Sequence, residues 1–179
     1  NFGRSVSIDG DIVVIGAIGD QSGSAYVFVR SNDVWSEQQK LTASDGGSND
    51  KFGYSVSIDG DTAVIGAYFN DENGSNSGSA YVYERSNGVW TLQQKLTASD
   101  GAENDYFGHS VSIDGDTALI GAWGDDYRQG SAYVFVRSNG VWSEEQKLTA
   151  SDGFENDIFG RSVSIDGNTA VIGAYWGDG

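Results

Sequence analysis

The chain has 179 residues, a formal net charge of -16 and a pI near 4.1. Its 10 Lys and Arg against 26 Asp and Glu argue against a protein that binds the phosphate backbone of nucleic acids. The lack of Cys excludes disulfides and thiolate chemistry, and a single histidine, His109, excludes a multi-histidine metal site. No apolar stretch approaches the roughly 18 residues that a membrane-spanning helix needs.

An internal repeat organises the whole chain. The dipeptide Phe-Gly recurs at spacings of 50, 55 and 52 residues, and each copy opens the same order of segments. The only part that varies in length is one loop per repeat, which spans 7, 12 and 9 positions in the first three copies (Ala17 to Ser24, Ala67 to Ser79, Ala122 to Ser131). We therefore divide the chain into three full repeats and a partial fourth: 1–51, 52–106, 107–158 and 159–179.

Four strands are predicted in each full repeat, and the second repeat shows them in chain order. The segment FGYSVSI alternates apolar and polar residues, TAVIGA is a short apolar run, and SAYVYER and VWTLQQKLTA are rich in β-branched and aromatic residues. Asp59-Gly60 separates the first pair and residues 86–88 (Ser-Asn-Gly) the second, which are hairpin signals between antiparallel neighbours. A repeated four-stranded meander without helical periodicity predicts an all-β protein, a β-propeller of four-stranded antiparallel blades.

The ring is predicted to be incomplete. The fourth repeat contains only its first two strands, so about three and a half blades are present. Closed propellers use 4–8 blades. We therefore expect other copies, or the missing blades of a longer chain, to close the ring.

The repeat resembles the FG-GAP repeats of integrin α-subunit propellers, and its sequence is most similar to bacterial-type FG-GAP repeats of secreted or surface proteins. The resemblance rests on Phe-Gly at the start of each unit, Gly-Ala at the end of its second strand, and the pattern FGxSVSIDGDTAVIGA…GSAYVF…KLTASDG. It implies an extracellular or cell-surface role in binding or adhesion. Two features depart from the family: residues such as Tyr68 stand where Gly-Ala-Pro has proline, and the integrin-type calcium loop is reduced to Asp9-Gly10-Asp11 and its copies. The usual calcium position therefore holds too few carboxylates.

Acidic residues are expected to gather on one face. In an antiparallel meander, the loop between the second and third strands and the connection to the next repeat lie at the same end; we call this end the loop face and the opposite end the hairpin face. The variable loops bring acids such as Asp20 and Asp178 to the loop face. Calcium ligands are predicted in the connections, at Asp45, Asn49, Asp50, Asp100, Asn104, Asp105, Asp152, Asn156 and Asp157. The alternative is a solvated acidic rim whose Asp and Asn residues satisfy turns.

Aromatic residues follow Gly-Ala at the same face. The candidate ligand-binding residues are Tyr68, Phe69, Trp123, Tyr175 and Trp176, whose rings are suited to stacking on sugars. The alternative is that these rings fill the space between adjacent blades. A second variable position follows Phe-Gly and is occupied by Arg4, Tyr54, His109 and Arg161, which would line the central channel if the first strand lies innermost.

No catalytic motif accompanies these residues. The sequence lacks a Gly-x-Ser-x-Gly elbow, a phosphate-binding loop and a dinucleotide fingerprint. Its acids recur once per repeat, as framework residues do. We therefore predict a non-enzymatic binding or adhesion propeller that contacts a protein or glycan through the loop face. The alternatives are a carbohydrate-binding propeller that uses the rim aromatics and a structural subunit of a larger repeat assembly.

Overall fold

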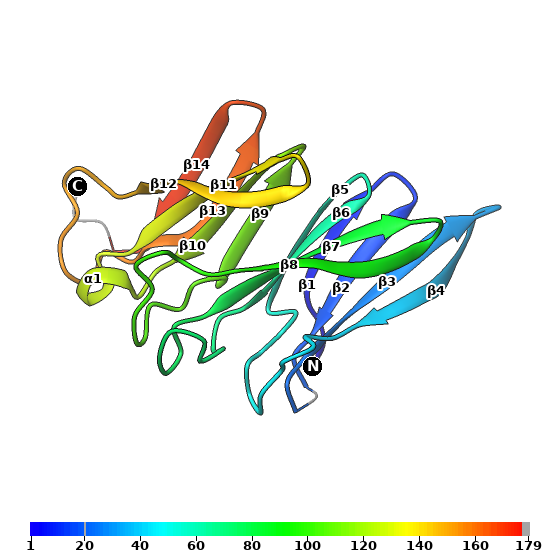
Figure 1. Ribbon diagram of the computed structural model, residues 1–179, viewed down its shortest axis with the longest axis horizontal. Coiled ribbons are helices and arrows are strands. Elements are labelled where there is room, and N and C mark those ends of the chain that lie inside the picture. Colours follow the sequence, from blue (N-terminus) through cyan, green and yellow to red (C-terminus); the bar gives the residue numbers. More distant parts are fainter. Residues whose placement is uncertain (20, 177–179) are drawn as a thin grey trace.

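The computed structural model describes residues 1–19 and 21–176, which form four antiparallel sheets in chain order (Figure 1). We call the sheets blades 1 to 4. Blade 1 contains β1 (Phe2–Asp9), β2 (Ile12–Ala17), β3 (Ser24–Ser31) and β4 (Val34–Leu41). Blade 2 contains β5 (Ser55–Asp59), β6 (Thr62–Ala67), β7 (Ser79–Ser86) and β8 (Val89–Leu96). Blade 3 contains β9 (Ser110–Asp114), β10 (Thr117–Ala122), β11 (Ser131–Ser138) and β12 (Val141–Leu148), and blade 4 contains β13 (Phe159–Asp166) and β14 (Thr169–Ala174).

Local sequence explains the meander. In blade 2, Val56 pairs with Ile65 across β5 and β6, in a register that the short Gly60-Asp61 loop sets. The loop between β7 and β8 places Asn87 and Gly88 at φ values of 51° and 79°, and positive φ at both positions is the signature of a hairpin turn whose twist matches the strands. The predicted all-β architecture of four-stranded antiparallel blades is therefore confirmed.

The blades pack side by side through their first strands. β1 contacts β5, β5 contacts β9 and β9 contacts β13, while β4, β8 and β12 lie at the outer edges (Figure 1). Apolar residues fill the space between neighbouring blades; Phe52 and Ile65 belong to the cluster between blades 1 and 2, and Phe107 and Ile120 to that between blades 2 and 3. Each sheet thus buries its faces against its neighbours rather than within itself.

The same polar contacts join each pair of blades. The Ser55 hydroxyl donates a hydrogen bond to the Gly108 carbonyl oxygen at 2.8 Å. A carboxylate at the hairpin end of the first strand accepts the backbone N–H of the next blade, as Asp59 does from Gly115 at 2.7 Å. The equivalent hydroxyl bonds join Ser5 to Gly53 and Ser110 to Gly160.

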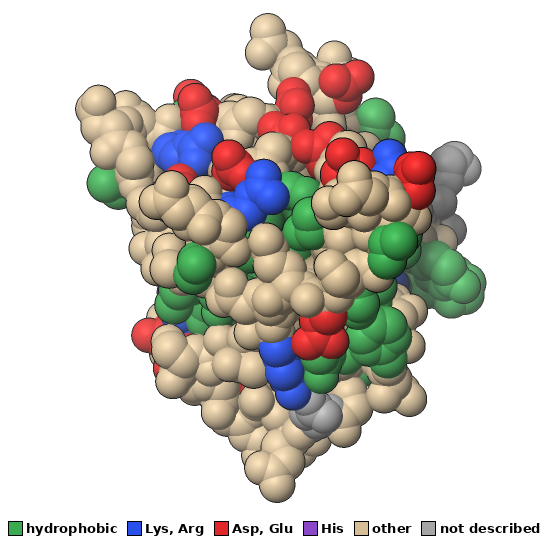
Figure 2. Space-filling view, turned by 90° about the vertical axis from the view of Figure 1, so that its right-hand side faces the viewer, with side chains coloured by type: hydrophobic (Ala, Val, Ile, Leu, Met, Phe, Trp, Pro, Cys, Tyr) green, Lys and Arg blue, Asp and Glu red, His purple; other side chains and the backbone are tan. Residues whose placement is uncertain are grey.

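The first and last blades expose the faces that the middle blades bury. Phe2 is 60% exposed, whereas its equivalents Phe52 and Phe107 are fully buried. Val171 in β14 is 66% exposed, whereas its equivalent Val64 in β6 is fully buried. Figure 2, viewed from the blade 1 side of the molecule, shows hydrophobic side chains at the surface between charged ones. The sheets do not close a ring, which fits an incomplete propeller that needs further blades.

One element was not expected from the sequence. A single helical turn, α1 (Asp125–Arg128), interrupts the loop between β10 and β11, and its residues Asp126 and Tyr127 have left-handed backbone angles. Among the described residues, no helix has the length and apolar character needed to cross a membrane.

Candidate functional site

The fold brings the variable loops and the inter-blade connections together at the loop face. The loop between β6 and β7 bonds directly to the connection that follows β8, because the backbone N–H of Asn104 donates to the Ser75 carbonyl oxygen at 2.8 Å. Gly78, just before β7, forms a parallel bridge with Phe107 of the next blade. A loop of variable length is therefore fixed at its base by the neighbouring blade.

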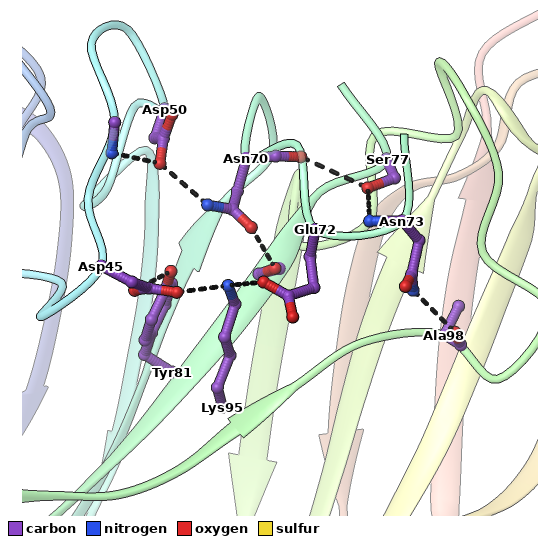
Figure 3. A network of polar contacts seen from close by, with 11 residues as sticks. Asp45, Asp50, Asn70, Glu72, Asn73, Ser77, Tyr81, Lys95 and Ala98 are labelled. Carbon is purple, nitrogen blue, oxygen red and sulfur yellow. Dashed lines mark hydrogen bonds and ion pairs between the residues drawn. The ribbon is translucent and has the colours of Figure 1, made fainter. Parts of the chain in front are cut away.

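Asp45 lies in an ionic network on this face (Figure 3). Its carboxylate accepts the Tyr81 hydroxyl at 2.9 Å and the Lys95 ammonium at 2.5 Å, and Lys95 also bonds Glu72 at 2.7 Å. Burial by itself would raise the pKa of Asp45, but the bonds from Lys95 and Tyr81 outweigh it and lower that pKa. Asp45 is thus ionised and already paired with a protein cation.

The next blade repeats this network with different neighbours. Asp100 accepts the Tyr133 hydroxyl at 2.8 Å and the Lys147 ammonium at 2.6 Å. Lys147 also pairs with the buried Asp125 at 2.7 Å. Asp152, the third member of the series, is exposed and has no such partner among the described residues, since the strands that would supply the Tyr and Lys belong to the incomplete blade 4.

The other predicted metal ligands shape the connections. The Asp50 carboxylate accepts the backbone N–H of Gly47 at 2.8 Å and the Asn70 side-chain amide at 2.8 Å. Burial raises the pKa of Asp105 to about 6, although a bond from the Ala102 N–H opposes this shift. Asp157 accepts the Phe154 N–H in the same way, and the three Asn residues have positive φ values of 75°, 66° and 74° (Asn49, Asn104, Asn156).

In two of the three connections, a carboxylate predicted to bind calcium already has a lysine partner, which is Lys95 at Asp45 and Lys147 at Asp100. Among residues 1–19 and 21–176, no group of three or more His, Asp or Glu residues has the arrangement needed to hold a metal ion. A cavity of about 320 Å³ at the loop face is nevertheless rich in carboxylates, which come from Asp45, Asp50, Asp71 and Glu72. Calcium binding at these residues stays a prediction. Asp20 and Asp178 lie outside the described residues.

The structure brings three of the five predicted aromatic residues into one cluster. The rings of Tyr68 and Phe69 are 4.0 Å apart, and both lie near Tyr106, at 6.1 and 5.8 Å. Tyr106 in turn stacks on Trp123, with centroids 4.5 Å apart and ring planes at 15°. All four rings are half-buried and lie between blades 2 and 3.

The remaining two predicted aromatics form a separate pair. Tyr175 and Trp176 follow β14 and contact each other at 4.8 Å in an edge-on arrangement. They are 68% and 63% exposed, so their rings face solvent. Tyr175 is equivalent in the repeat to Trp123, but in the described chain no blade follows to cover it.

Tyr106 is the member of the cluster that sequence reasoning missed. Tyr106 directly precedes the Phe-Gly that opens the third repeat. Lys51 and Ile158 precede those of the second and fourth repeats, and all three residues have φ near +60°. This backbone turn directs the Tyr106 side chain toward the loop that contains Tyr68 and Phe69. The sequence did contain one sign of this role, since Tyr106 is an aromatic residue at a position that varies between repeats.

The residues that follow Phe-Gly line a second cavity, on the inner strands. Arg4, Tyr54, His109 and Arg161 all border this cavity of about 270 Å³, as expected for a first strand that lies innermost. His109 is 8% exposed, and burial lowers its pKa to about 4, with the charges of Arg161 and Arg4 acting in the same direction. The imidazole is therefore neutral at pH 7.

Of the comparisons with known proteins, the match to a family model bears on the repeat. No curated protein sequence matches the chain. Among solved structures, TolB from Acinetobacter baumannii matches with 15% sequence identity and a TM-score of 0.48; the match covers 90% of this chain and 34% of that one, so the chain spans about a third of its length. The model of the FG-GAP repeat matches four times, at residues 1–28, 35–83, 90–135 and 142–179. The chain belongs to the FG-GAP repeat family.

Proposed function

We propose that this chain is a non-enzymatic binding module of an extracellular or cell-surface protein, which acts in adhesion through its loop face. The observation that carries the proposal is the contrast between fixed blades and variable loops. The blades repeat the same inter-blade bonds, whereas loops of different length and an aromatic cluster unique to blades 2 and 3 lie together at one end. Such an arrangement holds variable contact residues on a rigid base.

The uses of the acidic residues support a non-enzymatic role. Asp45 and Asp100 bond the same pair of residue types in successive blades, a Tyr hydroxyl and a Lys ammonium. Asp50 and Asp105 both accept backbone N–H groups in their own turns. Carboxylates with repeated structural partners are framework, whereas a catalytic pair would depart from the repeat.

A glycan is the second candidate ligand, and the exposed aromatic residues favour it. Tyr175 and Trp176 present open rings, and Tyr127 beside the same face is 79% exposed. Aromatic rings of this kind pack against the apolar faces of sugars, while nearby Asp and Asn side chains bond their hydroxyls.

A structural subunit of a larger assembly is the third candidate. The exposed apolar faces of blade 1 and blade 4 support it, since the middle blades bury the same residues against a neighbouring blade. Further blades, from other copies or from a longer chain, are the partners that these faces would accept.

The loop-face proposal is tested on arrays of immobilised peptides and of neutral and acidic oligosaccharides. We expect the labelled chain to bind, and Trp123→Ala and Trp176→Ala each to reduce the signal at least several-fold, because both remove aromatic contact area. Trp35→Ala is the matched control: Trp35 is 41% exposed and lies beside Arg30 at the hairpin face. Equal losses in all three variants, with folding verified by circular dichroism, would reject the loop face as the binding surface.

Calcium binding at the loop face is a separable proposal. We expect weak, millimolar binding, because calcium must displace Lys95 from Asp45. Titration calorimetry on chelator-treated protein measures it, and Lys95→Met should tighten binding by removing the competing cation. Arg30→Met, which frees Asp11 at the hairpin face, should leave it unchanged. The absence of both heat and a shift in melting temperature would refute calcium binding.

A further inference from the structure

The cavity on the inner strands is lined by one residue position of the repeat. Arg4, Tyr54, His109 and Arg161 are equivalent by sequence, and the stacking of β1, β5, β9 and β13 places them in a row. Serine and valine residues of the same strands complete the lining. The row therefore has a cation at each end and a phenol and an imidazole between them.

The two arginines differ from the framework cations in having no acidic partner. Arg30, Arg85 and Arg137 pair with aspartates at the hairpin face, and Lys95 and Lys147 pair with aspartates at the loop face. Arg4 and Arg161 form no ion pair with any residue that the structure describes. In a chain with 26 acidic residues, two unpaired guanidinium groups at one cavity are an exception that the repeat does not explain.

The cavity itself lacks carboxylates. None of its lining residues is Asp or Glu, whereas a cavity of about 420 Å³ at the hairpin face contains Asp59, Asp61 and Glu84, and the loop-face cavities are also acidic. The positive charge of the two arginines is therefore not neutralised within the cavity wall. An anion that enters meets two cations and no repulsive group in the wall.

Aromatic rings hold the two guanidinium groups in place. Arg4 Cζ lies 4.0 Å from the ring centroid of Tyr54, and Arg161 Cζ lies 5.4 Å from that of Trp123. A guanidinium stacked on a ring keeps its edge N–H groups free, and those groups bind carboxylates in a two-point geometry. The ring contacts thus restrict the two exposed guanidinium groups before a ligand arrives.

His109 connects the two ends of the row. Its ring lies 4.9 Å from Tyr54 and 6.0 Å from Trp123, and its Nδ1 atom is buried without a hydrogen-bond partner among the described residues. Because Arg4 and Arg161 both act on its pKa, the fields of the two cations overlap at this ring. A buried polar atom without a partner at such a position points to a bound polar group.

We propose that this cavity binds a small organic anion through its carboxylate, with Arg4 and Arg161 as the hydrogen-bond donors. The cavity has a volume of about 270 Å³ and is open to solvent at its two arginines, so an anion as large as one acidic sugar can enter it. The site borders the loop-face aromatic cluster and shares Trp123 with it. Its proposed donors and its probe are different, so either proposal can fail while the other stands.

Nuclear magnetic resonance of the unmodified chain tests the proposal, because His109 is the only histidine and its ring signals report on the cavity. D-glucuronate is the probe, D-glucose its neutral counterpart, and inorganic phosphate the competing anion. We expect glucuronate to shift the His109 signals in a saturable manner. We also expect its affinity for the cavity to fall when salt is added. No shift with glucuronate, an equal shift with glucose, or tighter binding of phosphate would overturn the assignment.

Arginine variants locate the site. Arg4→Gln and Arg161→Gln should each weaken glucuronate binding roughly tenfold or more, as expected for loss of a charge-assisted hydrogen bond. Arg128→Gln is the matched control, since Arg128 also lies over Trp123, at 5.7 Å, and has no described ion pair, but lines a different cavity. An equal loss in Arg128→Gln would show a general charge effect and reject the site. The His109 shift in the unmodified chain decides the question if a variant fails to fold.

Discussion

Gly66→Ala is expected to lower the free energy of unfolding by about 3 kcal/mol or more. A Cβ atom at Gly66 in β6 would overlap the Gly108 carbonyl oxygen of the next blade and the Ser55 hydroxyl, which itself bonds that oxygen. The Ser55 hydroxyl can rotate away only by giving up its bond to Gly108, and the Gly108 carbonyl is part of the backbone, so the two blades must shift apart. Thermal and urea unfolding measure the effect, and the melting temperature should fall by roughly 6–12 °C.

Gly173→Ala is the matched control for this experiment. Gly173 in β14 has the same position in the repeat, but its added Cβ would meet only its own blade, with the Ser162 hydroxyl nearest at 2.5 Å. That hydroxyl has no inter-blade acceptor among the described residues and can rotate away. We expect a loss of about 1 kcal/mol or less. Equal destabilisation by both substitutions would contradict the inter-blade origin of the effect.

Phe52→Ala is expected to cost roughly 3–5 kcal/mol, because truncating a fully buried phenylalanine leaves a cavity. Phe52 is 0% exposed and packs edge-on against Tyr81 at 5.3 Å, between blades 1 and 2. The surrounding strands are tied together by backbone and hydroxyl hydrogen bonds and cannot collapse into the space. Guanidinium unfolding gives the free energy, with the slope of the transition checked for two-state behaviour.

Phe2→Ala tests the same side chain without its neighbouring blade. Phe2 packs against Tyr26 at 5.4 Å but remains 60% exposed. We expect a loss below about 1.5 kcal/mol, since much of its apolar surface already faces water. A loss as large as that of Phe52→Ala at high protein concentration, and smaller on dilution, would show that another copy covers blade 1.

The architecture was predictable from the sequence because each repeat gives local signals that agree. Alternation in residues such as Val56 and Ile58 predicted a strand, and the turn residues Asn87 and Gly88 predicted the hairpin that the positive φ values confirm. Repetition then supplied the long-range information, since a blade that cannot bury both faces alone must pack against its copies. The short turn α1 was missed, because the left-handed backbone of Asp126 and Tyr127 follows no helical pattern in the sequence. The strands β5 and β8 are shorter than predicted, at Ser55–Asp59 and Val89–Leu96.

The candidate site was predictable only in part. The sequence placed Tyr68 and Trp123 on one face, but the stacking partner between them, Tyr106, depends on a backbone turn that sequence reasoning did not foresee. The acids were correctly placed in the connections. Their partners were not predicted, because Asp45 meets Lys95 of the next blade, 50 residues away in the chain.

The sequence by itself determined that this protein is a row of equivalent blades whose charge, turns and strands recur. Only the tertiary structure decided which equivalent positions are alike in environment. Phe2 and Phe52, Gly173 and Gly66, and Arg4 and His109 share repeat positions but not surroundings, since burial and pairing depend on the neighbouring blade and not on the residue. The physical reason is that the faces of a blade are buried by the neighbouring blades. The position of a blade within the row therefore decides what its side chains contact.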